Sequence, residues 1–144
     1  MNELTEKARR IFINDRYATD LTGIEIDLVD EKHTVCSLSI SDKHRNARGA
    51  VMGGVLFTLA DYTFAISSHT QTMAENMDTH DIILQWVSES SYINFLASPK
   101  GTTLKATSHL VKSGRSRCLY QIDIEDGTGR LVATVTTNGA RIQN

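Results

Sequence analysis

One segment of the chain, residues 50–66, is apolar on every side of the helix that it is expected to form. A helix that is hydrophobic all round is surrounded by protein, so the other elements are expected to enclose this one. The exception within it is Asp61, because its helical neighbours Phe57 and Phe64 provide no charged face. Burying an unpaired carboxylate is costly, and such acids gather at active sites. Asp61 is therefore a candidate catalytic group, the alternative being a structural carboxylate bonded to loop amides.

The segments on either side of this helix predict one more helix and a set of strands. Apolar residues at helical spacing predict a helix from residue 3 to about residue 14. Residues 69–82 are polar and are expected to be irregular. Alternating polarity predicts strands over residues 24–28, 35–40, 82–95, 103–111, 118–124 and 131–138. This order predicts a single α+β domain over residues 1–144, in which a bent antiparallel sheet of five to six strands wraps around the long helix.

Composition argues against several other classes of protein. The 15 basic and 17 acidic residues leave a formal net charge of −2, which gives no reason to expect a nucleic-acid or membrane partner. The two cysteines show no C-x-x-C spacing and the histidines no ligand spacing, so neither a disulfide framework nor a metal site is expected. The N-terminus lacks an apolar leader and no apolar run could span a bilayer, so a cytoplasmic protein is expected.

The segment leading into the long helix resembles the signature of a known family. The pattern N-x-x-G-x-x-M-G-G over residues 46–54, followed by Asp61, resembles that of hotdog-fold acyl-CoA thioesterases of the PaaI-like branch. The downstream order is also similar, with Pro99, a strand, a K-x-G-R turn at residues 112–115 and another strand. The resemblance covers residues 20–142 and implies the hotdog fold, with coenzyme A as part of the substrate and no separate cofactor.

The resemblance also implies roles for individual residues in hydrolysis of a thioester. Asp61 would attack the thioester or activate a water, and the sequence leaves both open. The Gly53 N–H would stabilise the oxyanion, and Asn46 would orient the water or the carbonyl. A polar residue early in the strand that ends near residue 95 would help to hold the water. Ser88 is the best match and Ser90 the second, since alternation is expected to place both on one strand face.

Further residues are candidates for binding the substrate. By resemblance, coenzyme A lies near the K-x-G-R turn, where basic side chains and turn amides could meet its phosphates. The acyl group is expected in a tunnel beside the long helix. The candidates are Met52, Gly54, Phe57, Phe64, Lys112, Gly114 and Arg115.

The chain departs from the family pattern in two places. Met52 stands where the family often has a histidine, which is thought to orient the asparagine of the motif. A thioether cannot donate a hydrogen bond, so Met52 would not orient Asn46 in this way. The interval from Asp61 to Phe95 is also longer than in similar members. The extra residues, 73–86, are expected to form a lid or to line the acyl pocket.

Geometry connects the two chemical groups of the long helix to an oligomer. Gly53 and Gly54 at the helix start leave N–H groups unpaired and unobstructed, which suits an anion, although the pair could simply permit close packing. Asp61 lies roughly 12 Å further along, at about 1.5 Å per residue. One chain therefore cannot aim both groups at one carbonyl, whereas two antiparallel helices of a two-fold dimer could. A homodimer is expected, and the resemblance implies that two dimers often associate.

Three functional classes remain open. An acyl-CoA thioesterase is favoured, and a non-catalytic acyl-CoA-binding hotdog protein is the alternative that Met52 supports. A hotdog hydratase or dehydratase ranks third because such enzymes generally need a histidine beside the carboxylate. The nearest histidine after Asp61 is His69.

Overall fold

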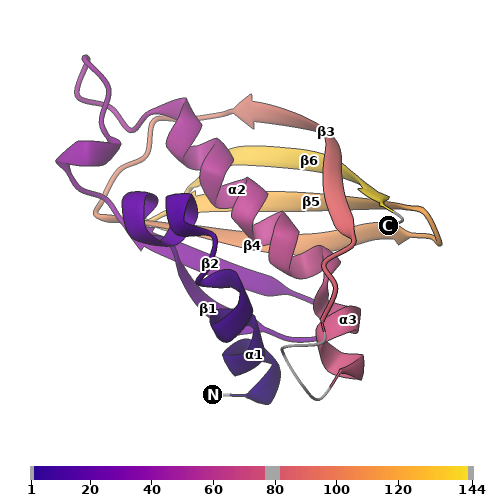
Figure 1. The fold of residues 1–144 in the computed structure, drawn as a ribbon. Coiled ribbons are helices and arrows are strands. Elements are labelled where there is room, and N and C mark those ends of the chain that lie inside the picture. Colours follow the sequence, from indigo (N-terminus) through magenta and orange to yellow (C-terminus); the bar gives the residue numbers. More distant parts are fainter. Residues whose placement is uncertain (1, 77–81, 143–144) are drawn as a thin grey trace.

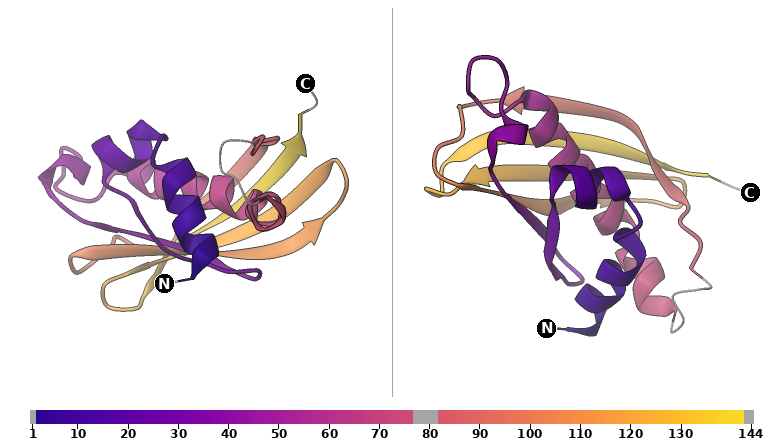
Figure 2. Two further views of the ribbon diagram at one scale, coloured as in Figure 1. Left: turned by 60° about the horizontal axis from the view of Figure 1, so that its bottom comes forward. Right: turned by 60° about the vertical axis from the view of Figure 1, so that its left-hand side comes forward.

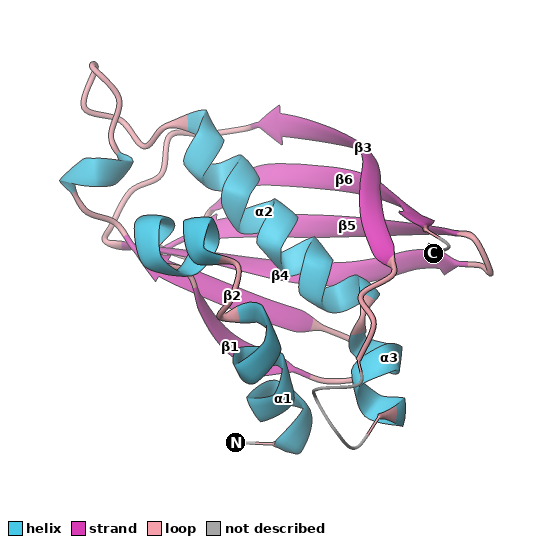
Figure 3. Cartoon of the chain, viewed as in Figure 1, coloured by secondary structure: helices cyan, strands magenta, loops and turns pink. Residues whose placement is uncertain are grey.

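The computed structural model describes residues 2–76 and 82–142, and it has the α+β arrangement that the sequence predicts. Within these residues, six strands form one antiparallel sheet in the order β1-β2-β4-β5-β6-β3 (Figure 1). The strands are β1 (Glu25–Val29), β2 (Thr34–Ser39), β3 (Trp86–Phe95), β4 (Thr103–Ser113), β5 (Arg117–Asp126) and β6 (Leu131–Arg141). The α-helices are α1 (Glu3–Phe12), α2 (Gly53–Ser68) and α3 (Thr70–Glu75), and Figure 3 shows them against the strands.

The long helix α2 lies across the concave face of the sheet, and the other helices lie on the same side (Figure 2). Leu59 and Ile66 of α2 are fully buried, as are Ile122, Ile124 and Val135 of the strands beneath. Burial of apolar side chains between the two layers is the main stabilising contribution to such a fold. The predicted wrapping of a sheet around one helix is therefore observed.

The helix α2 is not covered on every side, so the expectation that the other elements enclose it completely is wrong for the single chain. Its residues Gly54 and Asp61 are exposed, and Thr58, Ala65 and Ser68 are half-buried. These positions recur at intervals of three and four residues, so they form one stripe that faces away from the sheet. Asp61 therefore lies on an open face of the single chain and not within its core.

A segment between α1 and β1 forms a short π-helix, Tyr17–Thr22, that the periodicity did not predict. It lies alongside α2 in both views (Figures 1 and 2). The Thr22 hydroxyl donates to the Tyr17 carbonyl at 3.0 Å, and the ring Nε2 of buried His44 lies 2.7 Å from the Thr22 carbonyl. The Ser41 N–H donates to the other ring nitrogen, so Nε2 carries the proton. The Met52 N–H donates to the His44 carbonyl at 2.9 Å, so His44 ties this segment to the start of α2.

The segment after α2 is more ordered than its polarity suggested. Residues 70–75 form the helix α3, where an irregular stretch was expected. Met73 is fully buried, and the Lys7 ammonium of α1 donates to the Met73 and Asn76 carbonyls at 3.3 and 2.7 Å. Tertiary packing therefore stabilises a helix too short to form by propensity alone. Of the extra residues 73–86, positions 77–81 lie outside the described residues.

The strand β3 is an edge of the sheet and is widely exposed. It pairs with β6 alone among the described strands. Val87, Tyr92 and Phe95 are among its exposed apolar side chains. A ten-residue edge strand of this kind offers unpaired backbone groups to another strand.

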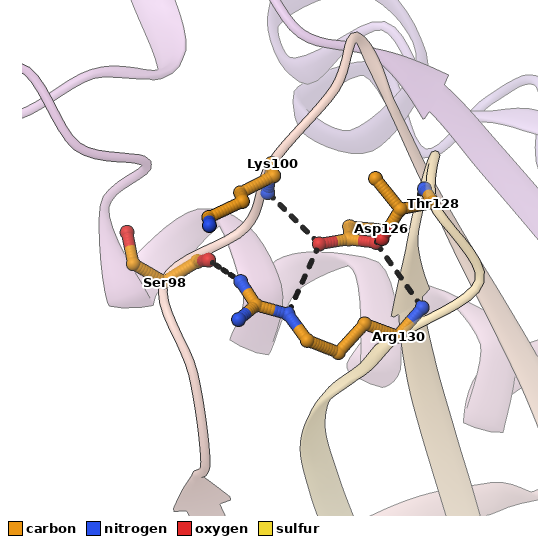
Figure 4. Close-up of polar contacts among 5 residues, drawn as sticks. All are labelled: Ser98, Lys100, Asp126, Thr128 and Arg130. Atoms are coloured by element: carbon orange, nitrogen blue, oxygen red, sulfur yellow. Dashed lines mark hydrogen bonds and ion pairs between the residues drawn. The ribbon is translucent and has the colours of Figure 1, made fainter.

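The turn between β5 and β6 is organised by Asp126 (Figure 4). Its carboxylate accepts from the backbone N–H groups of Lys100 at 2.9 Å and Thr128 at 2.9 Å, and from the Thr128 hydroxyl at 2.6 Å. Arg130 approaches it at 3.6 Å and also donates to the Ser98 carbonyl. These hydrogen bonds, that of the Thr128 hydroxyl first, hold the pKa of Asp126 well below its ordinary value. The loop before β4 is thereby fixed against the turn.

The structure also bears on membranes, metals and disulfides. No helix within residues 2–76 and 82–142 is long and apolar enough to cross a membrane. The same residues bring no three His, Cys, Asp or Glu side chains together as a metal site. Cys36 and Cys118 are buried free thiols.

Candidate active site

Asp61 opens into a hollow of about 500 Å³ between α2 and the first half of β3. We call this the Asp61 hollow. It brings Asp61 and Phe57 of α2 together with a third predicted residue, Ser88, which comes from the distant strand β3. No described residue donates a hydrogen bond to the Asp61 carboxylate, so its oxygens are free to take a proton or bind a water. The full lining is Tyr17, Phe57, Thr58, Asp61, Ser88, Glu89, Ser90 and Ser91.

A second acid lies on the other side of Asp61. Asp15 and Asp61 line one hollow of about 320 Å³, the Asp15 hollow, together with Tyr17 and Thr58. Partial burial, and then the negative charge of Asp15, raise the pKa of the Asp61 carboxyl above its ordinary value. A raised pKa makes the ionised carboxylate a stronger base, which suits proton abstraction from water.

A β-bulge in β3 turns the two candidate serines to opposite faces of the strand. The register shifts between Ser88 and Ser90, so that Ser88 lies opposite Gly139 and Ser90 opposite Asn138. Gly139 faces the helix, since a Cβ there would lie 2.7 Å from the Phe64 ring, whereas Asn138 is exposed. Side chains directly opposite on antiparallel strands share a face. Ser88 therefore points to the helix side, and the expectation that Ser90 shares its face is wrong, because the bulge breaks the alternation.

The start of α2 forms a separate hollow of about 560 Å³, the Gly53 hollow. Asn46, Gly53, Leu56, Phe95 and Pro99 contribute to its wall. Met52 caps the helix without a side-chain hydrogen bond, and the Gly53 and Gly54 N–H groups find no acceptor among the described residues. These N–H groups point out of the helix end and can bind an anion.

Gly53 and Gly54 differ in how much space surrounds them. A Cβ on Gly53 would lie 2.9 Å from the Phe95 ring, so the ring would have to move for any larger residue. A Cβ on Gly54 would meet nothing within 4 Å in the single chain. Close packing therefore accounts for Gly53 in part, but not for Gly54.

Asn46 is held in a turn with one end of its amide free. Its side-chain oxygen accepts from the Arg48 and Ala50 N–H groups at 2.9 and 3.1 Å. These two donors assign the oxygen, and the NH₂ group has no acceptor among the described residues. Asn46 thus has the structural role that loop asparagines often have, and it still presents a donor at the Gly53 hollow.

The Asp61 hollow and the Gly53 hollow share no lining residue within one chain. Asp61 lies eight positions after Gly53 along α2, which is roughly 12 Å. The acid and the helix end therefore open at two separate places on one chain.

The remaining predicted residues lie elsewhere. Phe64 is 2 % exposed and packs edge-on against Tyr120, so it is a core residue and lines neither of these hollows. Met52 is exposed and also lines neither. The Gly114 N–H donates to the Arg117 carbonyl at 2.8 Å, so this turn amide is not free for a phosphate.

Lys112 and Arg115 are exposed at the tip of the β4–β5 hairpin.

Asp15 and Tyr17 were not predicted from the sequence. No periodicity or motif marks their segment, because its position beside α2 is set by tertiary contacts.

A curved antiparallel sheet around one helix that carries an acid is a hotdog arrangement, and comparisons with known proteins agree. The sequence profile described as "Thioesterase superfamily" matches residues 48–133, more than half of the chain. The chain therefore belongs to the thioesterase superfamily. It is 29 % identical over 138 residues to the acyl-coenzyme A thioesterase PaaI of Escherichia coli, covering 95 % of this chain and 90 % of that protein. A 1,4-dihydroxy-2-naphthoyl-CoA hydrolase of Listeria monocytogenes is 27 % identical, with 76 % and 83 % covered.

Solved structures show the same fold. The structure of E. coli PaaI superimposes with a TM-score of 0.80 at 24 % identity, covering 99 % of this chain and 98 % of that one. Thioesterase superfamily member 2 of Mus musculus gives a TM-score of 0.78 at 18 % identity, with 97 % and 98 % covered. The protein is thus a PaaI-like member of the thioesterase superfamily with the hotdog fold, as its signature over residues 46–61 predicted.

Proposed function

We propose that the protein hydrolyses acyl-CoA thioesters in a site shared by two copies of the chain. The observation that carries this proposal is the division of α2 into two half-sites, an unpaired acid in one hollow and open helix-end N–H groups in the other. The two relatives named above are thioesterases of CoA esters, which supports the substrate class. Coenzyme A enters as part of the substrate, and no separate cofactor is proposed.

In the proposed reaction, Asp61 serves as general base or as nucleophile. As base, it takes a proton from a water that attacks the thioester carbonyl, and Ser88 on the same hollow helps to hold that water. The carbonyl oxygen becomes an oxyanion bound by the Gly53 N–H, with the Asn46 amide as a second donor. The C–S bond then breaks, the acid leaves, and the thiolate of coenzyme A takes the proton from Asp61. As nucleophile, Asp61 would attack the thioester carbonyl and expel the thiolate of coenzyme A to form a mixed anhydride. Water would then hydrolyse the anhydride, which releases the acid, restores Asp61 and supplies the proton that the thiolate takes.

The dimer follows from the separation of the half-sites and from exposed surfaces. The edge strand β3 and the open stripe of α2 lie on the side of the molecule where Asp61 and Gly53 open. Two-fold pairing would set the α2 helices antiparallel, so that each Asp61 meets the Gly53 of the other copy. By family resemblance, two such dimers are expected to associate. The molar mass measured by light scattering tests both the formation of the dimer and the association of two dimers.

Thiol release from a panel of CoA esters tests the activity directly. The panel contains acetyl, medium-chain, long-chain, benzoyl and phenylacetyl esters, assayed with wild type and Asp61→Asn. Turnover by wild type and its loss in Asp61→Asn are expected. Turnover retained by Asp61→Asn would overturn the role of this acid.

A mixed dimer tests whether the site is shared. Asn46→Ala alone is expected to lower kcat by about 10²–10³-fold, as for loss of one oxyanion donor. An Asp61→Asn chain and an Asn46→Ala chain, purified as a mixed dimer with two different tags, should together regain one intact site. About half of the wild-type rate per dimer is expected, because one of two sites combines both native residues. A mixed dimer as inactive as its parents would show that each site lies within one chain.

A non-catalytic acyl-CoA-binding protein is the second candidate. It is favoured by Met52, whose thioether provides no hydrogen bond at the helix start, and by the engagement of the Asn46 oxygen in a turn. The outcome that would establish it is a rise in melting temperature with CoA esters and no thiol release from any of them.

A further inference from the structure

The N-terminal segment places an aromatic side chain beside the candidate catalytic acid. Tyr17 lines both the Asp61 hollow and the Asp15 hollow, and it shares both with Thr58 and Asp61. Tyr17 therefore borders both of the open spaces that reach the carboxylate. The residue is 66 % exposed, so the described residues leave most of it uncovered.

Tyr17 is fixed in this position by its backbone. The Asp15 carbonyl accepts from the Ala18 and Thr19 N–H groups, both at 3.0 Å, and the Thr22 hydroxyl donates to the Tyr17 carbonyl. The bond between His44 and Thr22 then ties the segment to the loop that carries Asn46. The segment is a π-helix, a rare conformation that is frequent at functional sites. The backbone that carries the Tyr17 ring is therefore held in place beside α2.

The chemistry of Tyr17 suits contact with a ligand. An exposed phenol ring contributes little to the stability of its own chain, whereas aromatic side chains commonly line small-molecule sites. Its hydroxyl has no hydrogen-bond partner among the described residues. A ring at this position limits the width of any group bound at Asp61, because Tyr17 borders both spaces, of about 500 and 320 Å³, that reach this acid.

We propose that Tyr17 is a specificity-determining residue, whose ring restricts the bulk of the acyl group at the thioester end of the substrate. This inference rests on the proposed thioesterase function and adds a contact residue outside the matched region, residues 48–133. Removal of the ring would join the two hollows and admit wider acyl groups.

The test compares a narrow and a wide substrate with the same leaving group. Acetyl-CoA and phenylacetyl-CoA are assayed with wild type, Tyr17→Ala, Tyr17→Phe and Leu21→Ala. Leu21 is the matched control, since it lies in the same π-helix, is 64 % exposed and lines neither hollow. The ratio of kcat/KM for phenylacetyl-CoA to that for acetyl-CoA is expected to rise about tenfold in Tyr17→Ala, a typical effect of pocket shape on selectivity. Tyr17→Phe and Leu21→Ala should keep the wild-type ratio.

Two results would overturn the proposal. The first is an unchanged ratio in Tyr17→Ala, and the second is an equal change in Leu21→Ala. Failure of the Tyr17 proposal must be distinguished from failure of the proposed thioesterase function. Calorimetry does so, because it measures the binding of non-hydrolysable thioether analogues of both esters without any need for turnover. If wild type releases no thiol but Tyr17→Ala still shifts the relative affinity toward the wide analogue, Tyr17 keeps its role and only catalysis fails. An unshifted relative affinity overturns the role of Tyr17 with or without turnover.

Discussion

Asp15 and Asp61 line the same hollow, where partial burial and, after it, the negative charge of Asp15 raise the pKa of Asp61. The two acids come from the segment after α1 and from the middle of α2, so their proximity is a tertiary feature. Burial also raises the pKa of Asp15, while the positive charge of His69, when protonated, lowers it. The neighbouring Arg16 also lines this hollow, and its guanidinium is paired with Asp20.

Asp15→Asn should move the acidic limb of the kcat/KM profile to lower pH. Loss of the neighbouring negative charge makes ionised Asp61 easier to form, so the active carboxylate persists into more acidic solution. Asp27→Asn is the matched control, because it removes the same charge and the exposed Asp27 lines neither the Asp15 nor the Asp61 hollow. A limb that stays in place in Asp15→Asn, or that moves equally in Asp27→Asn, would contradict the prediction.

Asp61→Asn should raise the melting temperature at neutral pH although it abolishes turnover. A carboxyl whose folded-state pKa is raised lowers stability as pH rises from its unfolded value, about 3.9, through the folded value. The advantage of the asparagine variant should therefore grow over this range and vanish below about pH 4. Calorimetric melting of both proteins across pH measures it. A lower melting temperature at pH 7 would favour the structural-carboxylate interpretation instead.

Asp126→Asn should have the opposite pH dependence. Its folded-state pKa is lowered by hydrogen bonds, so its contribution to stability is present above about pH 4 and is lost as pH falls through the folded value. The variant is expected to melt lower than wild type at pH 7, with the difference shrinking in acid. Asp123→Asn on the same strand is the control, because Asp123 is half-exposed and pairs with His109 at 3.3 Å. Equal effects of the two substitutions would contradict the role assigned to the turn.

Alanine substitutions at two glycines should change stability in opposite directions. A Cβ on Gly54 or on Gly49 meets nothing within 4 Å, so neither change creates a clash. Gly54 is helical, and alanine there should stabilise the fold by about 0.5–1 kcal/mol. Gly49 has φ of +83°, where alanine should cost about 1–2 kcal/mol. Urea unfolding at one protein concentration measures both. If both substitutions changed the free energy of unfolding in the same direction, backbone conformation would not explain the glycines at these two positions.

Local pattern was sufficient to predict the main elements. The apolar stretch over residues 50–66 predicted a helix, and α2 spans Gly53–Ser68. Alternating polarity located the strands to within a few residues. These features depend on neighbours in the sequence, because the periods of helix and strand are set by the backbone itself. The motif over residues 46–61 likewise placed an acid and a helix end on one element.

Only the tertiary structure decided how these groups are presented. Asp61 proved to lie on an open stripe, because the sheet covers α2 on some sides and leaves one side uncovered. The bulge in β3 turned Ser88 and Ser90 to opposite faces, although strict alternation places them together. The helix α3 formed where polar residues suggested a loop, because Met73 is buried there.

The neighbours of the acid also came from the tertiary structure alone. Asp15 and Tyr17 flank Asp61 because the π-helix docks beside α2, a contact between segments more than forty positions apart in the sequence. The sequence by itself determined which element carries the acid and the anion-binding helix end, since both depend on local backbone geometry. The fold decided what surrounds them, because burial, strand register and docking are set by contacts between distant segments that no local pattern records.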